Sequence, residues 1–184
     1  MTFRRLFLFA FAAALLAGLG CSNDSGGSAA PALVCTDGGN AAANSVNTNC
    51  GGALDSVTEQ VDIIVGGPAA GSTTLRGLNF DVTYDPAKLT FMPAASYTSP
   101  LFPAPDALIA VSSPVAGRVI ASVQQTGGVA PVSVTPGQYV VLSLTFQSVS
   151  GVTYAPTPIS LENYDATSPS TAISFASGTA IAYQ

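Results

Sequence analysis

Few side chains in this chain of 184 residues could carry out chemistry. There are ten acidic and five basic residues but no His, so the usual general base and the commonest metal ligand are missing. Asp81 and Asp85 lie four positions apart, on a predicted strand and in the turn after it, so we expect their carboxylates to diverge. A glycosidase instead needs two carboxylates that flank one bond. With no Gly-x-Ser-x-Gly motif either, the sequence predicts a protein that is not an enzyme.

The remaining acids and the cysteines do not predict a metal site. Asp62, Glu162 and Asp165 could join a calcium site only through the fold, because no Asp-x-Asp-x-Asp-Gly spacing exists in the chain. The absence of His and of any Cys-x-x-Cys spacing argues against zinc. We therefore expect no metal and no cofactor, and the default interpretation of the acids is that they are solvated.

Aromatic rings offer a different chemistry, because exposed rings can stack on sugars. The candidates are Tyr97, Phe102, Tyr139, Tyr154 and Tyr164. The chain has no Trp, the best ring for this purpose, and these rings could equally pack beneath loops. Carbohydrate binding is therefore kept as an alternative function.

The first twenty residues have the pattern of an export signal. Arg4 and Arg5 precede an apolar run over residues 6–19, and a small residue follows. A run of about 14 residues is shorter than the roughly 20 that a permanent membrane helix needs, which favours cleavage. The paired arginines also fit a twin-arginine signal, but the strongly apolar run favours the general secretory pathway. We predict a signal peptide over residues 1–20.

Residues 16–21 resemble the lipobox of bacterial lipoproteins, in which the Cys becomes the acylated N-terminus. The resemblance implies lipidation of Cys21 and, because Ser22 follows it, a place in the outer membrane or at the cell surface. A plain secretory signal is the alternative. Acylation of Cys21 would leave Cys35 and Cys50 as a pair, which we expect to form a disulfide outside the cytoplasm.

The segment after the signal differs in composition from the rest of the chain. Residues 21–54 are rich in Ser, Gly, Ala and Asn with little periodicity, so they predict a flexible tether in which the disulfide closes a compact knot. Without the signal, three basic residues face ten acids, a net charge of −7. This charge argues against nucleic-acid binding, which needs clustered cations. Membrane contact is expected only through the lipid anchor.

Residues 55–184 predict one all-β domain. Charged residues make up only 8% of the chain, whereas Gly (18) and Pro (13) are frequent, which is typical of short strands separated by turns. The clearest alternation covers residues 78–84, where the even positions are apolar and Asn79, Asp81 and Thr83 share the other face. Further strands are predicted at residues 57–65, 89–91, 108–111, 119–123, 138–148, 159–161 and 173–183. The pattern predicts an antiparallel β-sandwich of about eight or nine strands.

Residues 75–89 resemble the signature stretch of cohesin domains, in which a strand with an Asn-x-Asp pair runs into Tyr-Asp-Pro and a following Leu. Here the Asn and Asp are Asn79 and Asp81, and Tyr-Asp-Pro occupies residues 84–86. The resemblance extends over residues 57–184 and is strongest over 75–91. It implies a sandwich with jelly-roll topology, shared with related carbohydrate-binding modules, that binds the calcium-loaded dockerin module of a partner protein.

The resemblance also implies which residues meet the partner. In cohesins the Asn and Asp of the pair stand on the outward face of a strand and hydrogen-bond the dockerin, so Asn79 and Asp81, with Thr83 beside them, are the expected contacts. The alternation independently predicts that all three side chains point into solvent, although ordinary solvated residues would give the same pattern. We expect a non-catalytic, surface-anchored docking module in an extracellular, polysaccharide-related assembly. The alternatives are a carbohydrate-binding module with a polysaccharide ligand and a structural or adhesive lipoprotein of the cell envelope.

Overall fold

The computed structural model describes residues 32–36, 39–150, 155–167, 174–175 and 178–183. The thirteen elements in these residues are all strands. Within the described part of the chain, no helix has the length and apolar character needed to cross a membrane. The predicted signal peptide over residues 1–20, the lipidation candidate Cys21 and the aromatic candidate Tyr154 lie outside the described residues.

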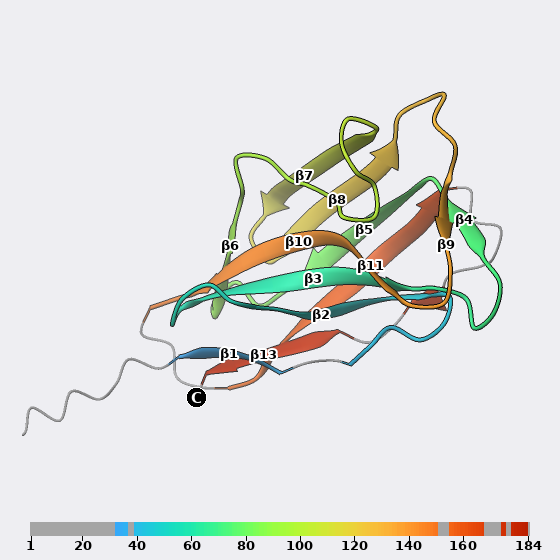
Figure 1. Cartoon of the computed structure of the whole chain (residues 1–184). Helices are drawn as coiled ribbons and strands as arrows, with labels where there is room; N and C mark the ends of the chain where they lie inside the picture. The colour runs from blue at the N-terminus through green and yellow to red at the C-terminus, as the bar shows by residue number, and fades with distance from the viewer. Residues whose placement is uncertain (1–31, 37–38, 151–154, 168–173, 176–177, 184) are drawn as a thin grey trace, which may run out of the picture.

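Two sheets pack face to face in a sandwich (Figure 1). In spatial order, the six-stranded sheet contains β1 (Leu33–Thr36), β13 (Thr179–Tyr183), β11 (Thr157–Thr167), β5 (Gly77–Thr83), β8 (Arg118–Gln125) and β7 (Ala107–Val115). The five-stranded sheet contains β12 (Ser174–Phe175), β2 (Ser45–Ala53), β3 (Thr58–Gly66), β10 (Gln138–Ser148) and β6 (Leu89–Met92). A short pair, β4 (Thr73–Leu75) with β9 (Val132–Val134), lies beside them. All strand pairs are antiparallel except β12 with β2, which confirms the predicted all-β sandwich.

The core comes from alternating strands, as the sequence predicts. Leu78, Phe80 and Val82 of β5 are at most 1% exposed, and their neighbours in the chain face the other side of the sheet. From the facing sheet, β10 contributes the fully buried Leu142 and Phe146. The predicted turn after β5 is also present, where Asp85 Oδ1 accepts a hydrogen bond from the backbone N of Ala87 at 2.9 Å.

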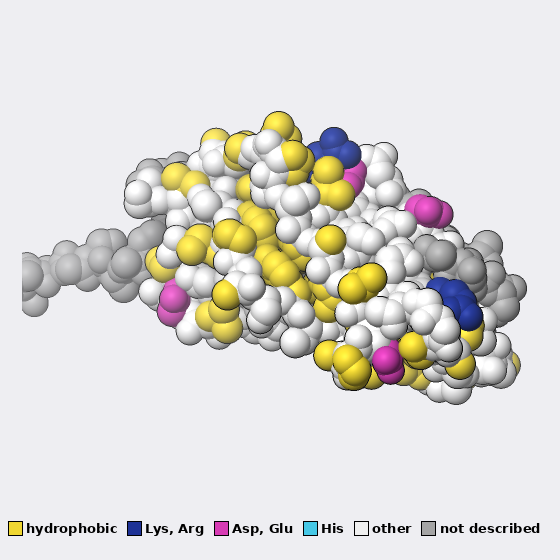
Figure 2. Space-filling view, turned by 90° about the horizontal axis from the view of Figure 1, so that it is seen from above, with side chains coloured by type: hydrophobic (Ala, Val, Ile, Leu, Met, Phe, Trp, Pro, Cys, Tyr) yellow, Lys and Arg dark blue, Asp and Glu magenta, His cyan; other side chains and the backbone are white. Residues whose placement is uncertain are grey.

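The surface carries few charged side chains. Figure 2 looks onto the side of the molecule where β7 and β8 lie in Figure 1, and it shows hydrophobic and uncharged polar side chains with scattered Lys, Arg, Asp and Glu. This agrees with a chain in which charged residues make up 8%. Any recognition by this surface must therefore use uncharged polar and apolar groups to a large extent.

The sandwich begins at Leu33, earlier than residue 55, where the sequence analysis places its start. β2 pairs with β3 from Ser45↔Gly66 to Ala53↔Glu59, and Val46 is fully buried in the core. The reason is that β3 offers a long partner strand, against which even small and polar residues of this segment are buried. Thr48 on the inward face is 0% exposed, and its hydroxyl accepts from the Thr179 backbone N and donates to the Ile159 carbonyl at 3.5 Å. β1 and β2, which lie in the segment expected to be a tether, are thus strands of the sandwich.

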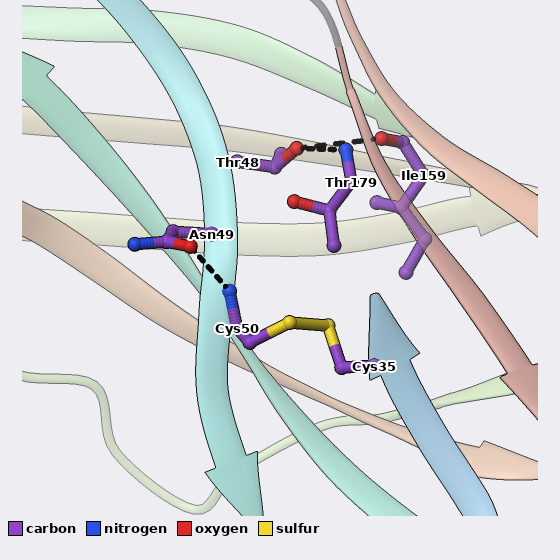
Figure 3. Close-up of a disulfide and its surroundings, with 6 residues drawn as sticks. All are labelled: Cys35, Thr48, Asn49, Cys50, Ile159 and Thr179. Carbon is purple, nitrogen blue, oxygen red and sulfur yellow. Dashed lines mark hydrogen bonds between the residues drawn. A yellow bond between two sulfur atoms is a disulfide. The ribbon is translucent and has the colours of Figure 1, made fainter. Parts of the chain in front are cut away.

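A disulfide fastens this N-terminal part of the sandwich. Cys35 of β1 and Cys50 of β2 are joined, 15 positions apart in sequence. Because β1 belongs to the six-stranded sheet and β2 to the five-stranded one, the bond links the two layers. Figure 3 shows it beside the Thr48 hydroxyl, which bridges the same two sheets. The predicted pair therefore closes the sandwich rather than a knot in a tether.

Candidate functional site

The expected contact residues lie on the side of the six-stranded sheet that points away from the core, over β11, β5, β8 and β7. We call this surface the outward face. Residues directly opposite one another on neighbouring strands share a face, so the strand register defines three rows across it. These rows are Glu162–Asp81–Ile120–Ser112, Asp165–Asn79–Ser122–Ala110 and Ser160–Thr83–Arg118–Val115.

Asp81 lies on this face, but the expectation that it points into solvent is wrong. The residue is only 4% exposed. Its Oδ2 accepts two hydrogen bonds from the Arg118 guanidinium, one of them from Nε at 3.1 Å, and a third from the amide of Asn163. Alternation places a side chain on one face of a sheet, but neighbours on that face can still cover it. Asp81 therefore holds other residues of the face in position.

The third donor reaches Asp81 through an irregularity in β11. The register between β11 and β5 shifts between Glu162 and Asp165, and Asn163 within this bulge has a φ of 47°. Asn tolerates this left-handed conformation better than most residues. The bulge thereby turns the Asn163 amide toward the carboxylate of the neighbouring strand.

Asn79 is half-buried and has a fixed orientation. Its Oδ1 accepts from Ser122 Oγ at 2.6 Å and from Gln124 Nε2 at 3.1 Å, both on β8. Both donors bind the same oxygen, so the Nδ2 group of Asn79 remains available as a hydrogen-bond donor. The side chain is thus held with its donor ready for a partner.

Thr83, the third expected contact, is half-buried at the end of β5. Its Oγ1 lies 3.5 Å from the carbonyl oxygen of Ser160 and 3.4 Å from Glu162 Oε1, both on β11. These distances are long for hydroxyl hydrogen bonds. The hydroxyl can therefore exchange these contacts for better ones with a partner at little cost.

Apolar side chains accompany the polar ones on the same face. Ile120 of β8 is 37% exposed and occupies the row of Asp81, while Leu108 of β7, opposite Gln124, is 64% exposed. Val115, at the end of β7 opposite Arg118, is 58% exposed. Exposed apolar side chains next to oriented polar groups are the combination that protein interfaces use.

The outward-facing residues of β8 were not among the predicted contacts. Strands are predicted over residues 108–111 and 119–123, and the structure confirms both and pairs them. The alternation that defines the two faces of β5 also applies to β8, where Arg118, Ile120, Ser122 and Gln124 have outward parity. The contact from Asn163 had no comparable signal, because a bulge changes the parity within a strand.

The candidate metal ligands are not brought together. Glu162 and Asp165 lie on the outward face, whereas Asp62 is on β3 of the other sheet and accepts from Gln60 Nε2 at 3.0 Å and Ser143 Oγ at 2.6 Å. In the described residues, no group of three or more His, Cys, Asp or Glu side chains could hold a metal ion.

The described aromatic candidates do not form one sugar-stacking surface. Phe102 is 1% exposed and belongs to the core. Tyr97 is half-buried, and its hydroxyl accepts a hydrogen bond from the Ala94 backbone N at 3.0 Å. Tyr139 lines a groove together with Gln60 and Asp62 of β3, and its hydroxyl lies 2.7 Å from Thr135 Oγ1. The side chain of Tyr164 lies outside the described residues.

Comparison with solved structures supports the architecture. The sixth cohesin of scaffoldin B from Acetivibrio cellulolyticus, in complex with a mutant Cel5 dockerin, superposes with a TM-score of 0.55 at 16% identity, covering 73% of this chain and 95% of the cohesin chain. A type II cohesin domain from the cellulosome of the same organism gives a TM-score of 0.51 at 14% identity, covering 74% and 93%. No family model and no curated protein matches the sequence. The chain thus has the cohesin fold, a β-sandwich of jelly-roll topology, as the resemblance implied.

Proposed function

We propose that this chain is a non-catalytic docking module and that its outward face binds a dockerin-type module of a partner protein. The observation that carries the proposal is an Asn79 amide fixed with its donor free, beside the exposed Ile120, on one face of a cohesin fold. The similar cohesin from Acetivibrio cellulolyticus is in complex with a dockerin. The absence of His from the sequence is consistent with a binding role rather than catalysis.

The residues of the face would contribute in different ways. Ile120 and Leu108 supply apolar area, which gives most of the binding energy when a partner covers it. Asn79 donates a directional hydrogen bond, and Thr83 adds a hydroxyl. Asp81 acts indirectly because it holds Arg118, whose side chain is 43% exposed. Because the guanidinium is already held in place, a hydrogen bond to an acceptor on the partner costs little further side-chain entropy.

The calcium of such an assembly would belong to the partner. In the described residues this chain offers no cluster of metal ligands, whereas the resemblance implies a dockerin that folds around calcium. Binding should therefore disappear when a chelator is added, although the stability of this chain alone should stay the same.

We further propose that the module is exported and held at the cell surface. The signal pattern of residues 1–20 and the lipobox-like sequence before Cys21 support an acylated N-terminus in the outer membrane. The disulfide between Cys35 and Cys50 is consistent with an oxidising compartment. An anchored docking module would recruit a secreted partner to an extracellular, polysaccharide-related assembly.

The test is calorimetric titration of the chain with a panel of calcium-loaded dockerin modules. Ile120→Asp should weaken binding about thirtyfold, which corresponds to about 2 kcal/mol, and Asn79→Ala should weaken it by about 1 kcal/mol. Leu54→Asp is the matched control, because Leu54 is an exposed apolar residue (59%) outside the outward face. Binding that Ile120→Asp leaves unchanged would exclude this face. Retention on insoluble polysaccharide, with no dockerin bound, would favour a carbohydrate-binding module instead.

A further inference from the structure

A second surface lies at the free edge of the six-stranded sheet. A groove of about 610 Å³ runs between strand β7 and the loop that follows β6. One wall is formed by the consecutive residues 107–111 of β7, and the other by the consecutive residues 94–99 of the loop. Phe102, a core residue that is 1% exposed, lies at its base.

The residues that line the groove show that it follows the edge of the strand. Successive side chains of a strand point to opposite faces of the sheet. A cavity over one face would therefore contact only alternate residues of β7. This groove contacts five in a row, from Ala107 to Val111, so it lies along the side of the strand where both faces meet.

The backbone at this edge is available for pairing. β7 is the last strand of its sheet, and among the described residues it pairs only with β8. In an antiparallel pair, half of the N–H and C=O groups of an edge strand point away from its neighbour. No backbone hydrogen bond from another described segment reaches residues 107–112 on that side. The groove thus presents a row of unpaired donors and acceptors.

The part of the edge that lines the groove lacks two features that commonly prevent strand pairing, which are charged side chains, above all Lys, and a very short strand. The irregularity in the pairing of β7 with β8 lies beyond this part, between Ser112 and Val115. β7 is nine residues long and has no charged residue, and its only proline, Pro114, lies beyond the part that lines the groove. Figure 2 shows hydrophobic side chains gathered along the middle of the side where β7 lies.

From these observations we infer that the edge of β7 binds an extended, uncharged peptide segment of a partner as an additional strand. The main chain of the peptide would pair with residues 107–111, and its alternate apolar side chains would face Ile109 and Val111. Five residues of extended chain span about 17 Å, and peptides bind sheet edges in this way in several protein families. The inference does not depend on the docking proposal, since it rests on the unpaired backbone at the edge of the sheet, although Leu108 and Ala110 belong to both surfaces.

The walls of the groove decide the kind of occupant. None of the residues that line it is charged, so an uncharged segment enters without leaving a charge unpaired. The loop wall begins with Ala94, Ala95 and Ser96, whose short side chains leave space beside the strand. Because this wall stands opposite β7, the groove has room for a single strand, and a second folded copy would meet the loop first.

The experiment uses the full mature chain and a seven-residue peptide of alternating valine and serine, acetylated and amidated so that it has no charge. The peptide is titrated by NMR, and amide hydrogen exchange is recorded with and without it. We expect saturable binding below about 1 mM and slower exchange at residues 107–111. The controls are two peptides with alternate backbone nitrogens methylated, one at the odd and one at the even positions. At least one of them should fail to bind, because it lacks the N–H donors that face the edge.

Two lysine variants test the position. Val111→Lys places a charge in the groove, and Ala110→Lys places one at an exposed site on the same strand, where folding is not at risk. Both should weaken binding about tenfold or more, while Ala70→Lys, a matched change at an exposed turn residue, should have no effect. The inference is overturned if the peptide does not bind, if binding leaves exchange in β7 unchanged, or if Ala110→Lys binds as the parent does. A dimer in sedimentation experiments that Ala110→Lys dissociates would overturn it in favour of a second copy.

Discussion

Replacing Asp81 by Ala tests whether this carboxylate organises the outward face. The side chain is 4% exposed and receives hydrogen bonds from Arg118 and Asn163. Truncation removes the acceptor for both donors at once. If the carboxylate were only a solvated contact residue, as the sequence alone predicts, its removal would leave stability almost unchanged.

The size of the effect follows from the exposure of the two partners. A hydrogen bond to a charged group contributes about 1.5–3 kcal/mol, and a fully buried ion that loses its partner can cost more. The Arg118 side chain is 43% exposed, so water can solvate the guanidinium once Asp81 is gone. We therefore expect Asp81→Ala to lower the free energy of unfolding by about 2 kcal/mol. In a domain of this size that corresponds to a fall in Tm of about 4–8 °C.

Urea unfolding followed by circular dichroism measures this quantity. Glu162→Ala is the control, because Glu162 lies opposite Asp81 on β11 but is exposed, and its loss should cost less than about 0.5 kcal/mol. A double-mutant cycle with Arg118→Ala should give a coupling of about 1 kcal/mol or more. A stability for Asp81→Ala within 0.5 kcal/mol of the parent, or additive effects of the two variants, would refute the view that Asp81 positions Arg118.

Three further changes test the interior of the sandwich. Burial raises the pKa of Glu59 above its ordinary value of 4.5, against a hydrogen bond from the Gly52 backbone. The folded state therefore keeps this proton to higher pH than the unfolded chain does. As pH rises above 4.5, the free energy of unfolding should fall relative to that of Glu59→Gln, and a difference between the two proteins that stays constant with pH in urea unfolding would contradict this. Replacing Cys35 and Cys50 by Ser should cost about 3 kcal/mol in urea unfolding, because their bond closes a loop of 15 positions. Thr48→Val should cost about 1–3 kcal/mol in the same assay because it leaves a buried N–H of β13 unpaired, whereas Thr90→Val, at an exposed site on β6, should be nearly neutral.

The strands with clear alternation could be predicted from the sequence, and those without it could not. β5 and β10 have large apolar residues on one parity, and this pattern alone locates them. β2 has Val46 and Thr48 at its inward positions and Gly at its exposed end, so its composition is that of a linker. It is a strand because β3 offers a long partner and because the Thr48 hydroxyl has bonding partners in the opposite sheet. Both causes are tertiary and leave no local signal.

The same distinction applies to the site. Parity places Asn79, Asp81 and Thr83 on one face, and the structure agrees on the face. Exposure depends in addition on the neighbouring strands, and here Arg118 from β8 and Asn163 from the bulge of β11 cover one of the three residues. The alternation therefore predicted the face that the three residues share, but not the burial of Asp81, whereas the roles of Asn79 and Ile120 in binding remain part of the proposal.

The order of the strands relates the proposed anchor to both proposed binding surfaces. β1 and β13 pair from Leu33↔Tyr183 onward at one edge of the six-stranded sheet, and β7 forms the other edge (Figure 1). Five inter-strand steps of about 4.8 Å separate β1 from β7, so the edges lie about 24 Å apart. The 12 positions from Cys21 to Leu33 could extend over at most about 40 Å. A chain held by an acylated Cys21 would enter the sheet at β1, the edge remote from β7, and a tether that can extend farther than the width of the sheet would let the domain turn away from the membrane. Both the outward face around Asn79 and the groove beside β7 would then remain accessible to partners arriving from solution.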